Sequence, residues 1–311
     1  MYLPFETFSR YWFMYLPFFS TVVPIIYKFY KWFVVLLYGH SELERIIMKN
    51  NFGFVRTIRI ERSFRLSDNV MVRDGLYTLP LPKYVALVFR IENVANSMYC
   101  FFLTECFRLS VDFKQSIIQI RGYRSLIVKA DALKNLPFNT NEETHVIWNS
   151  MIVDEPFSLK SRRWSDIGFQ GSSPVTDFRG MGALGAENFR YFVKYYNKLA
   201  LSILSSSLRP QHWYPFAIVG INLTSLLWRL LQDGTLKTHF YNSLKGTPKL
   251  VHLHLVYIYL FVKFNEFWNQ QPRDVMQFNV YLDKFEEAIR KQMGDENSML
   301  PLHVLKCGVT Q

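Results

Sequence analysis

Arg179 precedes three glycines, Gly180, Gly182 and Gly185, which have the spacing Gly-x-Gly-x-x-Gly. This spacing binds the pyrophosphate of a dinucleotide when the first glycine ends a strand and the last glycine opens a helix. Here the preceding residues, SSPVTDFR, contain a proline and several polar side chains where a buried parallel strand would have to lie. The acidic residue that binds the ribose is also missing, because no Asp or Glu occurs in residues 188–232. We therefore exclude a dinucleotide site.

The glycines around Arg179 instead indicate a tight turn that presents the arginine. Glycines are common where the backbone turns sharply or approaches another group closely. Thr176 or Asp177 can cap the following turn and fix the direction of the segment. Arginine stays charged at physiological pH, and its planar fork of donors suits phosphate oxygens. Two interpretations remain open: Arg179 projects toward a phosphate, or it pairs with Asp177 or Asp166 and only holds the loop together.

The composition is that of a globular chain with a basic surface. The 311 residues are 50% hydrophobic and 17% aromatic, which is enough for a core in one large domain or two ordinary ones. A formal charge of +11 suits an anionic surface, such as phospholipid, nucleic acid or the acidic face of a partner protein. The basic residues are spread through the chain and no nucleic-acid module is recognisable, so we expect no nucleic-acid partner.

The cysteines and histidines do not have the spacing of a metal site. Cys100, Cys106 and Cys307 are too few and too widely separated for a disulfide framework or a zinc site, so we expect reduced thiols in a cytosolic environment. His252 and His254 are two residues apart, and on a helix they point to different faces. We expect no metal site in this chain.

The N-terminal segment, residues 1–40, differs from the rest in being apolar and rich in aromatic residues. An uncharged run at residues 11–27 is at the lower limit of length for a membrane span, and Pro17 and Pro24 interrupt it. Aromatic side chains with lysines next to them suit the interface between lipid and water. The segment is therefore either a membrane anchor, lying on the bilayer or spanning it, or an aromatic helix packed on the main domain.

The second half of the chain shows strong helical patterns. Residues 187–204 carry apolar side chains at helical spacing on one face. Residues 215–234 and 250–268 are apolar nearly all round, and the polar residues that interrupt them favour buried core helices over membrane spans. Residues 273–293 predict another helix, with Asp274 as its N-cap. These patterns predict an all-α fold, a compact multi-helix domain.

The region before residue 136 has weaker patterns. Residues 76–115 are apolar enough to be buried, but the pattern does not choose between helix and strand. Residues 116–136 predict a helix, with a break at Gly122 left open. Asn139 or Thr140 can then cap a following helix.

A stripe of arginines lies within the segment VRTIRIERSFRL. The stripe consists of Arg56, Arg59, Arg62 and Arg65, one at every third position. This spacing favours neither helix nor strand, and two interpretations remain: a basic patch that faces lipid, or a solvated charged face. The solvated face is the expectation.

Several long blocks resemble the ELMO-domain (engulfment and cell motility) family. The block WSDIGFQGSSPVTDFRGMGALGAENFRYF, residues 164–192, is similar to the signature of that family. Residues 215–242 and 257–285 resemble its later blocks in the expected order. The chain is more similar to the short ELMO domain-containing proteins than to the large engulfment scaffolds. The resemblance covers most of the chain and is strongest from about Asn139 to Arg290.

This resemblance implies a domain organisation. The compact multi-helix ELMO domain is expected at residues 136–293, with an N-terminal extension at 41–135 that packs on it. The hydrophobic aromatic segment occupies residues 1–40, and residues 294–311 form a C-terminal tail. The reduced cysteines and the aromatic N-terminal segment together predict a place in the cytoplasm, on the cytosolic face of an intracellular membrane.

The resemblance further implies a GTPase-activating protein for Arf-family, chiefly Arf-like, small GTPases. The family needs the arginine that follows Asp-Phe, and this position is Arg179 here. An arginine supplied in trans neutralises charge that develops on the transferred phosphoryl group. On this interpretation the chain is not a stand-alone enzyme, and it has no cofactor of its own, since GTP and magnesium belong to the partner. The alternative is a non-catalytic adaptor that binds small GTPases or trafficking and cytoskeletal partners.

Other residues of the motif are expected to support the arginine or to anchor it. Gln170 either contacts the nucleotide or the switch region of the partner, or it only stabilises the turn. The supporting loop is expected to comprise Gln170, Thr176, Asp177, Gly180 and Gly182. The packing residues are expected to be Trp164, Phe169 and Phe178.

Two positions depart from the family pattern. Ser172 and Ser173 stand where relatives commonly have an acidic residue, and Ala186 replaces a leucine. If the missing carboxylate orients the arginine, activity is weaker here. Ser173 can still accept hydrogen bonds and initiate the turn.

Overall fold

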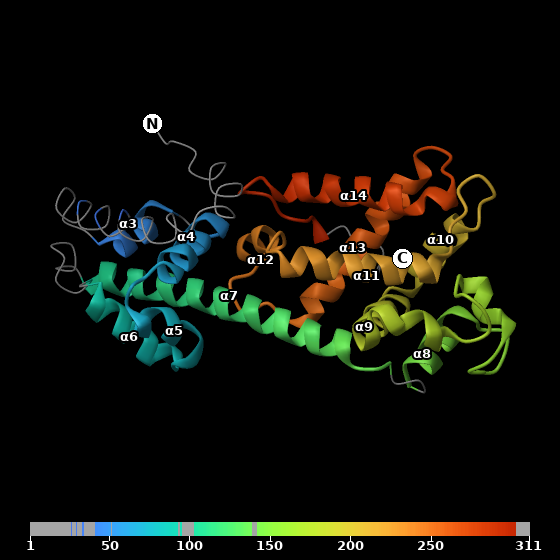
Figure 1. Cartoon of the computed structure of the whole chain (residues 1–311), viewed down its shortest axis with the longest axis horizontal. Coiled ribbons are helices and arrows are strands. Elements are labelled where there is room, and N and C mark those ends of the chain that lie inside the picture. Colours follow the sequence, from blue (N-terminus) through green and yellow to red (C-terminus); the bar gives the residue numbers. More distant parts are fainter. Residues whose placement is uncertain are drawn as a thin grey trace. The chain divides into compact units, whose positions relative to one another are not determined.

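The computed structural model describes residues 26, 29, 33, 41–50, 52–92, 94, 103–138 and 142–302. Within these residues every regular element is an α-helix or a 3-10 helix, and none is a strand, which confirms the all-α prediction (Figure 1). The predictions for the N-terminal segment, for capping by Asn139 or Thr140 and for the cysteine side chains lie outside the described residues, apart from single helical positions at 26, 29 and 33.

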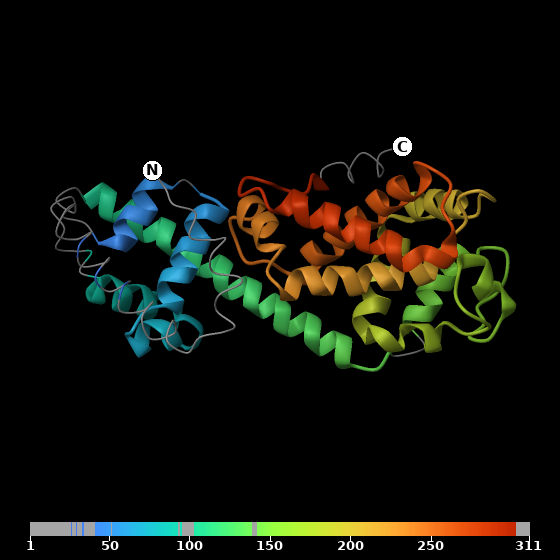
Figure 2. The ribbon, with the colours of Figure 1, turned by 45° about the horizontal axis from the view of Figure 1, so that its top comes forward.

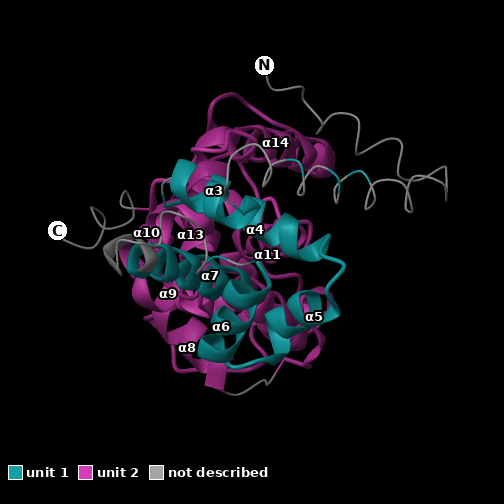
Figure 3. Ribbon diagram, turned by 90° about the vertical axis from the view of Figure 1, so that its left-hand side faces the viewer, with its two compact units in different colours: residues 1–121 teal, residues 122–311 magenta. Residues whose placement is uncertain are grey.

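The chain divides into two compact units, residues 1–121 and 122–311 (Figure 3). The division falls within one long helix, α7 (Leu103–Asn135), which contributes to both units. The domain boundaries expected at residues 40, 135 and 293 stay predictions. Among the described residues before α7, the helices with defined bounds are α3 (Glu42–Lys49), α4 (Phe54–Arg65), α5 (Val70–Thr78) and α6 (Leu81–Ile91).

In unit 1, helix α3 is capped at its N-terminus, and aromatic rings form a core. The Ser41 hydroxyl accepts a hydrogen bond from the backbone N–H of Glu44, whose carboxylate accepts one from the backbone N–H of Ser41. Phe64 packs edge-to-face on Tyr84 and Phe113, with ring centroids 6.0 and 5.6 Å apart. All three rings are buried, so α4, α6 and α7 share one core.

The arginine stripe lies on α4. The prediction that its side chains form a solvated face is wrong for one of the four arginines. Arg59, Arg62 and Arg65 are exposed, whereas Arg56 is only 1% exposed and pairs with Asp112 at 3.0 Å. Positions three apart on a helix differ by about 60° in direction, so a stripe of this length covers half the circumference. One end of it must therefore turn toward the core. Burial lowers the pKa of Arg56, and the charge of Asp112 opposes that effect.

The break considered at Gly122 does not occur, because α7 runs through it without interruption. The missing side chain serves close packing instead. A Cβ atom at Gly122 would lie 2.6 Å from Cδ of Pro248 and 2.8 Å from Cγ2 of Thr247. The glycine thus lets the loop before α13 approach the helix, and a helix interior tolerates a single glycine at a modest cost.

In the described part of unit 2, eight α-helices or 3-10 helices lie between α7 and the last pair of helices. They are α8 (Glu142–Met151), η2 (Arg162–Ile167), η3 (Pro174–Gly180), α9 (Gly182–Tyr195), α10 (Asn197–Ser207), α11 (Phe216–Gln232), α12 (Lys237–Ser243) and α13 (Leu250–Asn269). The last pair is η4 (Val275–Gln277) and α14 (Phe278–Met293). The backbone N–H of Met276 donates to the Asp274 carboxylate at 2.9 Å, which confirms the predicted N-cap.

The core of unit 2 lies between α9, α11 and α13, which pack against one another (Figure 2). Phe216 of α11 lies with its ring centroid 4.9 Å from that of Phe261 on α13 and 5.5 Å from that of Phe189 on α9. The two helices that are apolar nearly all round, α11 and α13, are therefore core helices, as predicted. Within the described part of the chain, no helix has both the length and the apolar character required to cross a bilayer.

The pattern at residues 187–204 predicts one helix, but the structure has two. The backbone of Tyr196, at φ −126° and ψ 40°, separates α9 from α10. The Asn197 side-chain amide donates to the backbone oxygen of Val193 at 3.1 Å and to that of Ser150 at 2.6 Å. A side chain thus satisfies a carbonyl near the break and ties it to α8, which no local periodicity reveals.

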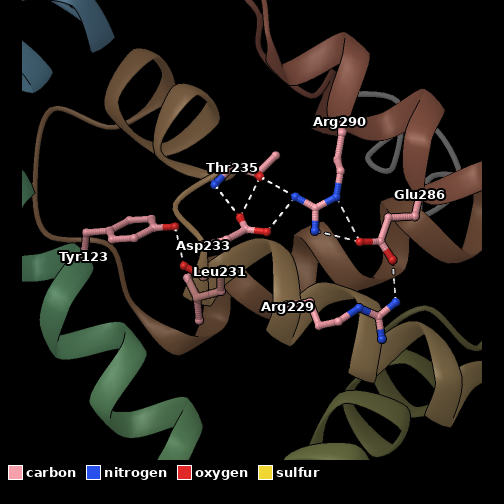
Figure 4. Close-up of polar contacts among 7 residues, drawn as sticks. All are labelled: Tyr123, Arg229, Leu231, Asp233, Thr235, Glu286 and Arg290. Atoms are coloured by element: carbon pink, nitrogen blue, oxygen red, sulfur yellow. Dashed lines mark hydrogen bonds and ion pairs between the residues drawn. The ribbon is translucent and has the colours of Figure 1, made fainter. Parts of the chain in front are cut away.

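A cluster of charged side chains joins α11 to α14 (Figure 4). We call it the α11–α14 charge cluster; it comprises Arg229, Asp233, Thr235, Glu286 and Arg290. Arg290 donates to Asp233 and to Glu286, each at 2.6 Å, and Arg229 donates to the second oxygen of Glu286. Burial by itself would raise the pKa of Glu286, but the two arginines outweigh it and lower that pKa.

Candidate functional site: the arginine turn before α9

Arg179 lies near the end of η3, directly before α9. We call residues 168–182, the loop after η2 together with η3, the arginine turn. Gly168 ends η2 in the left-handed conformation, with φ at +86°. Ser173 and Pro174 then start η3, with the proline in its first turn, where its fixed φ is compatible with a helix.

Three buried aromatic side chains anchor this turn. Trp164, Phe169 and Phe178 are at most 4% exposed. The ring of Phe169 lies 5.5 Å from that of Trp164 and 5.6 Å from that of Phe178, in edge-to-face contacts. Phe178 also packs on Phe138 in a tilted arrangement, with the ring centroids 4.8 Å apart. The residue next to Arg179 is thus held in the core, and burial of such a ring is worth several kcal/mol, about 3–5 on truncation to alanine.

Two glycines fix the ends of the turn by close backbone contact. A Cβ atom at Gly168 would lie 2.4 Å from the backbone nitrogen of Phe216, at the start of α11. A Cβ atom at Gly182 would lie 2.3 Å from the backbone oxygen of Lys134, near the end of α7. Next to it the backbone N–H of Ala183 donates to the oxygen of Leu136 at 3.1 Å. Larger residues do not fit at either glycine without displacing main chain.

Asp177 connects the two arms of the turn. Its carboxylate accepts a hydrogen bond from the backbone N–H of Gln170 at 2.7 Å, and a second, longer one from the Thr176 hydroxyl at 3.3 Å. Burial raises the pKa of Asp177, and these hydrogen bonds together with the nearby charge of Arg179 offset only part of that effect. The carboxylate therefore serves mainly to hold the loop at Gln170 against η3.

The guanidinium of Arg179 is exposed and is directed by the backbone rather than by a carboxylate. Its Nε donates to the backbone oxygen of Thr176 at 3.1 Å. Asp166, one of the two acids expected as an alternative partner, pairs with Arg163 at 3.1 Å instead. Within the described residues, neither Asp166 nor Asp177 forms an ion pair with Arg179. Its two terminal nitrogens are thus available for an anionic ligand.

Comparison with known proteins assigns the chain to a family. The model of the ELMO/CED-12 family matches residues 129–282, which include the whole arginine turn. Human ELMO domain-containing protein 2 is 35% identical over 283 residues, a match that covers 88% of this chain and 94% of the relative. The chain belongs to the ELMO/CED-12 family.

Other ELMO relatives match over a similar length. Mouse ELMO domain-containing protein 1 is 32% identical over 304 residues, covering 89% of this chain and 91% of that protein. ELMO domain-containing protein B of Dictyostelium discoideum is 29% identical over 274 residues, covering 85% and 94%. No solved structure matches this chain.

Within this ELMO-family fold, the expected site residues lie together in one stretch of structure. Gln170, Thr176, Asp177, Arg179 and Gly180 all belong to the arginine turn, and Gln170 and Gly180 are exposed. Ser172 is exposed, and its backbone oxygen accepts a hydrogen bond from Ser161 at 2.9 Å, so the loop is closed without an acidic residue there. The other departure, Ala186, is fully buried on α9.

The sequence did not reveal two supports of the ELMO turn. Arg163 fixes η2 by pairing with Asp154 at 2.6 Å as well as with Asp166. At the start of α9, the Leu136 backbone oxygen accepts a hydrogen bond from the Ala183 N–H, and the Lys134 backbone oxygen lies close to Gly182. The cluster of glycines was the available signal for a close backbone contact, but nothing local identifies the partner at Lys134, more than forty residues earlier. In the part of the chain that the structure describes, no group of three His, Cys, Asp or Glu residues is arranged to hold a metal ion.

Proposed function

We propose that this protein stimulates GTP hydrolysis by an Arf-family, chiefly Arf-like, small GTPase. Arg179 is the residue that acts, supplied in trans to the γ-phosphate of the GTP bound to the partner. The observation that carries the proposal is the state of its guanidinium, which is exposed and directed by the backbone oxygen of Thr176. Membership of the ELMO family supports the same function.

An arginine in this position has a large effect because a GTPase alone leaves the charge on the transferred phosphoryl group poorly neutralised. An arginine supplied in trans raises turnover by about 10³- to 10⁵-fold. This corresponds to about 4–7 kcal/mol of the activation barrier. The nucleotide and magnesium belong to the partner, so this chain contributes only the cation and the surface that places it.

The cation is effective only if the turn is rigid before the partner binds, since positioning during the reaction would cost part of the gain. Four features of the turn provide that rigidity. Phe178, the residue directly before Arg179, is buried in the core. The Asp177 carboxylate accepts a hydrogen bond from the Gln170 backbone and so joins η3 to the loop at Gln170. The close contacts of Gly168 and Gly182 fix the two ends on α11 and α7.

The test is a GTP-hydrolysis panel of purified Arf and Arf-like proteins in single-turnover conditions. We expect the full chain to accelerate hydrolysis by at least one of them, and Arg179→Ala to remove at least 99% of the acceleration. Arg179→Lys retains a charge but loses the planar fork, so we expect it to be nearly as inactive. Arg209→Ala, which removes another exposed arginine of unit 2, is the matched control and should leave the acceleration unchanged.

Two results would overturn the proposal. One is full acceleration by Arg179→Ala. The other is a wild-type chain that binds a GTP-loaded partner but leaves its hydrolysis rate unchanged, which would identify a non-catalytic adaptor.

We propose in addition that residues 1–40 bring the protein to the cytosolic face of an intracellular membrane. The support is the aromatic, lysine-flanked composition of the segment. Sedimentation of the full chain with phosphatidylcholine vesicles, with and without phosphatidylserine, tests this. We expect binding that increases with phosphatidylserine and decreases when Phe18 and Phe19 are both changed to Ser. Binding that is the same for the double variant would contradict the proposal.

A further inference from the structure

The glycines of the arginine turn differ in what would prevent a side chain. Gly168 and Gly182 lie against main-chain atoms of other helices, at 2.4 and 2.3 Å from a Cβ atom built on them. Gly171 has open space around it, but its φ of +96° is a conformation that side chains rarely adopt. The fold itself therefore explains why each of these three residues is a glycine.

Neither a close contact nor a left-handed backbone conformation requires a glycine at residue 180. Gly180 is the last residue of η3, it is exposed, and its φ does not lie in the left-handed region. Apart from its two chain neighbours and the backbone of its own helix, no atom of the described residues lies within 4 Å of a Cβ atom built on it. An alanine would fit there and would restrict the unfolded chain, which favours the folded state. The fold thus gives no reason for a glycine at the position directly after Arg179.

Glycine is suited to a place where another backbone or a ligand approaches closely. The residue before Gly180 carries the exposed guanidinium, and Leu136, whose backbone oxygen receives the start of α9, is 53% exposed. The backbone directly after the exposed guanidinium of Arg179 therefore carries no side chain that would keep a partner away.

We infer that Gly180 is a contact residue that lets the main chain of the partner GTPase come close enough for Arg179 to reach the γ-phosphate. This inference rests on the proposed function. An arginine side chain extends only a limited distance from its Cα atom, so a methyl group at residue 180 that holds the partner away also increases the distance that the guanidinium must span to the phosphate. A misplacement of about 1 Å in a catalytic group costs on the order of 100-fold in rate.

The experiment compares a series at one position with a matched glycine elsewhere. Gly180→Ala and Gly180→Leu add side chains of increasing size, and we expect the first to reduce stimulated hydrolysis about 10- to 100-fold and the second to reduce it further. The probe is the GTP-loaded member of the panel that wild type stimulates most. Thermal melting should show both variants as stable as wild type or more so. Gly246→Ala is the control, because Gly246 is also exposed with no atom of the described residues within 4 Å of a built Cβ, and it should leave hydrolysis unchanged.

The outcomes separate this inference from the function beneath it. Wild-type stimulation by Gly180→Leu overturns the inference, even if Arg179→Ala is inactive. A graded loss at residue 180 with unchanged melting, and no loss in Gly246→Ala, supports it. Full stimulation by Arg179→Ala, or none by wild type across the panel, overturns the proposed function and this inference with it.

Discussion

Arg179 and Arg290 lie in the same unit, each near acidic side chains, yet their guanidinium groups have different partners. In the α11–α14 charge cluster, Arg290 donates to Asp233 and Glu286, each at 2.6 Å, and to the Thr235 hydroxyl at 3.0 Å. In the arginine turn, Arg179 donates through Nε to a backbone oxygen, and among the described residues it forms no ion pair with Asp166 or Asp177.

The acidic residues of the two regions also differ, both in the direction of their pKa shifts and in the groups that they bind. Burial favours the neutral form of Glu286, but hydrogen bonds from Arg229 and Arg290 lower its pKa overall. Burial raises the pKa of Asp177, which accepts its shorter hydrogen bond from a backbone N–H. In the charge cluster, cations and anions stabilise each other and the fold. In the arginine turn, the carboxylate holds the backbone and leaves the cation available.

The largest expected effect comes from the aromatic anchors beneath the two regions. Phe178→Ala and Phe285→Ala each truncate a ring that is at most 3% exposed, so each should lower the free energy of unfolding by about 3–5 kcal/mol. Only Phe178→Ala should also reduce stimulated hydrolysis, measured at a temperature where both variants are folded. Equal hydrolysis by the two variants would show that the anchor of the turn does not position Arg179.

The next prediction concerns how the stability contributed by the α11–α14 charge cluster depends on pH. Glu286→Gln should lower the free energy of unfolding by about 1–2 kcal/mol at pH 7. Because the folded-state pKa of Glu286 and of Asp233 is lowered, their contribution is present above the unfolded values near pH 4 and is lost as the pH falls through the folded values. Urea denaturation should therefore show the difference between wild type and Glu286→Gln shrinking as the pH is lowered from 5 to 3. A difference that stays constant would contradict this assignment.

A smaller effect is expected at Asp177. Asp177→Ala removes the acceptor for the Gln170 N–H and should cost about 1 kcal/mol. Asp177→Asn keeps an acceptor and removes an ionised form that burial disfavours, so it should cost less than about 0.5 kcal/mol. Denaturation at pH 7 measures both. If Asn is as destabilising as Ala, the charge of Asp177 stabilises the turn and the contrast with Glu286 disappears.

The smallest effect on stability is expected at Arg179 itself. Arg179→Ala removes an exposed side chain with one hydrogen bond to the backbone, so the free energy of unfolding should change by less than about 0.5 kcal/mol. Arg290→Ala should cost about 1 kcal/mol or more, since two ion pairs are lost. Denaturation of the two variants in parallel gives the comparison. A larger loss for Arg179→Ala would mean that this arginine is a structural residue.

The sequence alone predicted the helical class, the buried helices α11 and α13, the Asp274 cap and the stretch that contains the candidate site. These features depend on local patterns: the spacing of apolar residues, the residue at a helix start, and the density of glycines. The family resemblance singled out Arg179 within that stretch, a role that stays a prediction.

Only the tertiary structure decided what each polar group contacts. The burial of Arg56 against Asp112, the packing of Gly122 on Pro248 and the break at Tyr196 all depend on residues distant in the chain. The partner of Arg179 was also open in the sequence, since two carboxylates, Asp166 and Asp177, precede it. The folded turn pairs Asp166 with Arg163, three residues earlier, and Asp177 with the backbone N–H of Gln170. A charge takes its partner from the groups that the fold brings within reach, and the sequence alone does not say which of the nearby polar groups that will be.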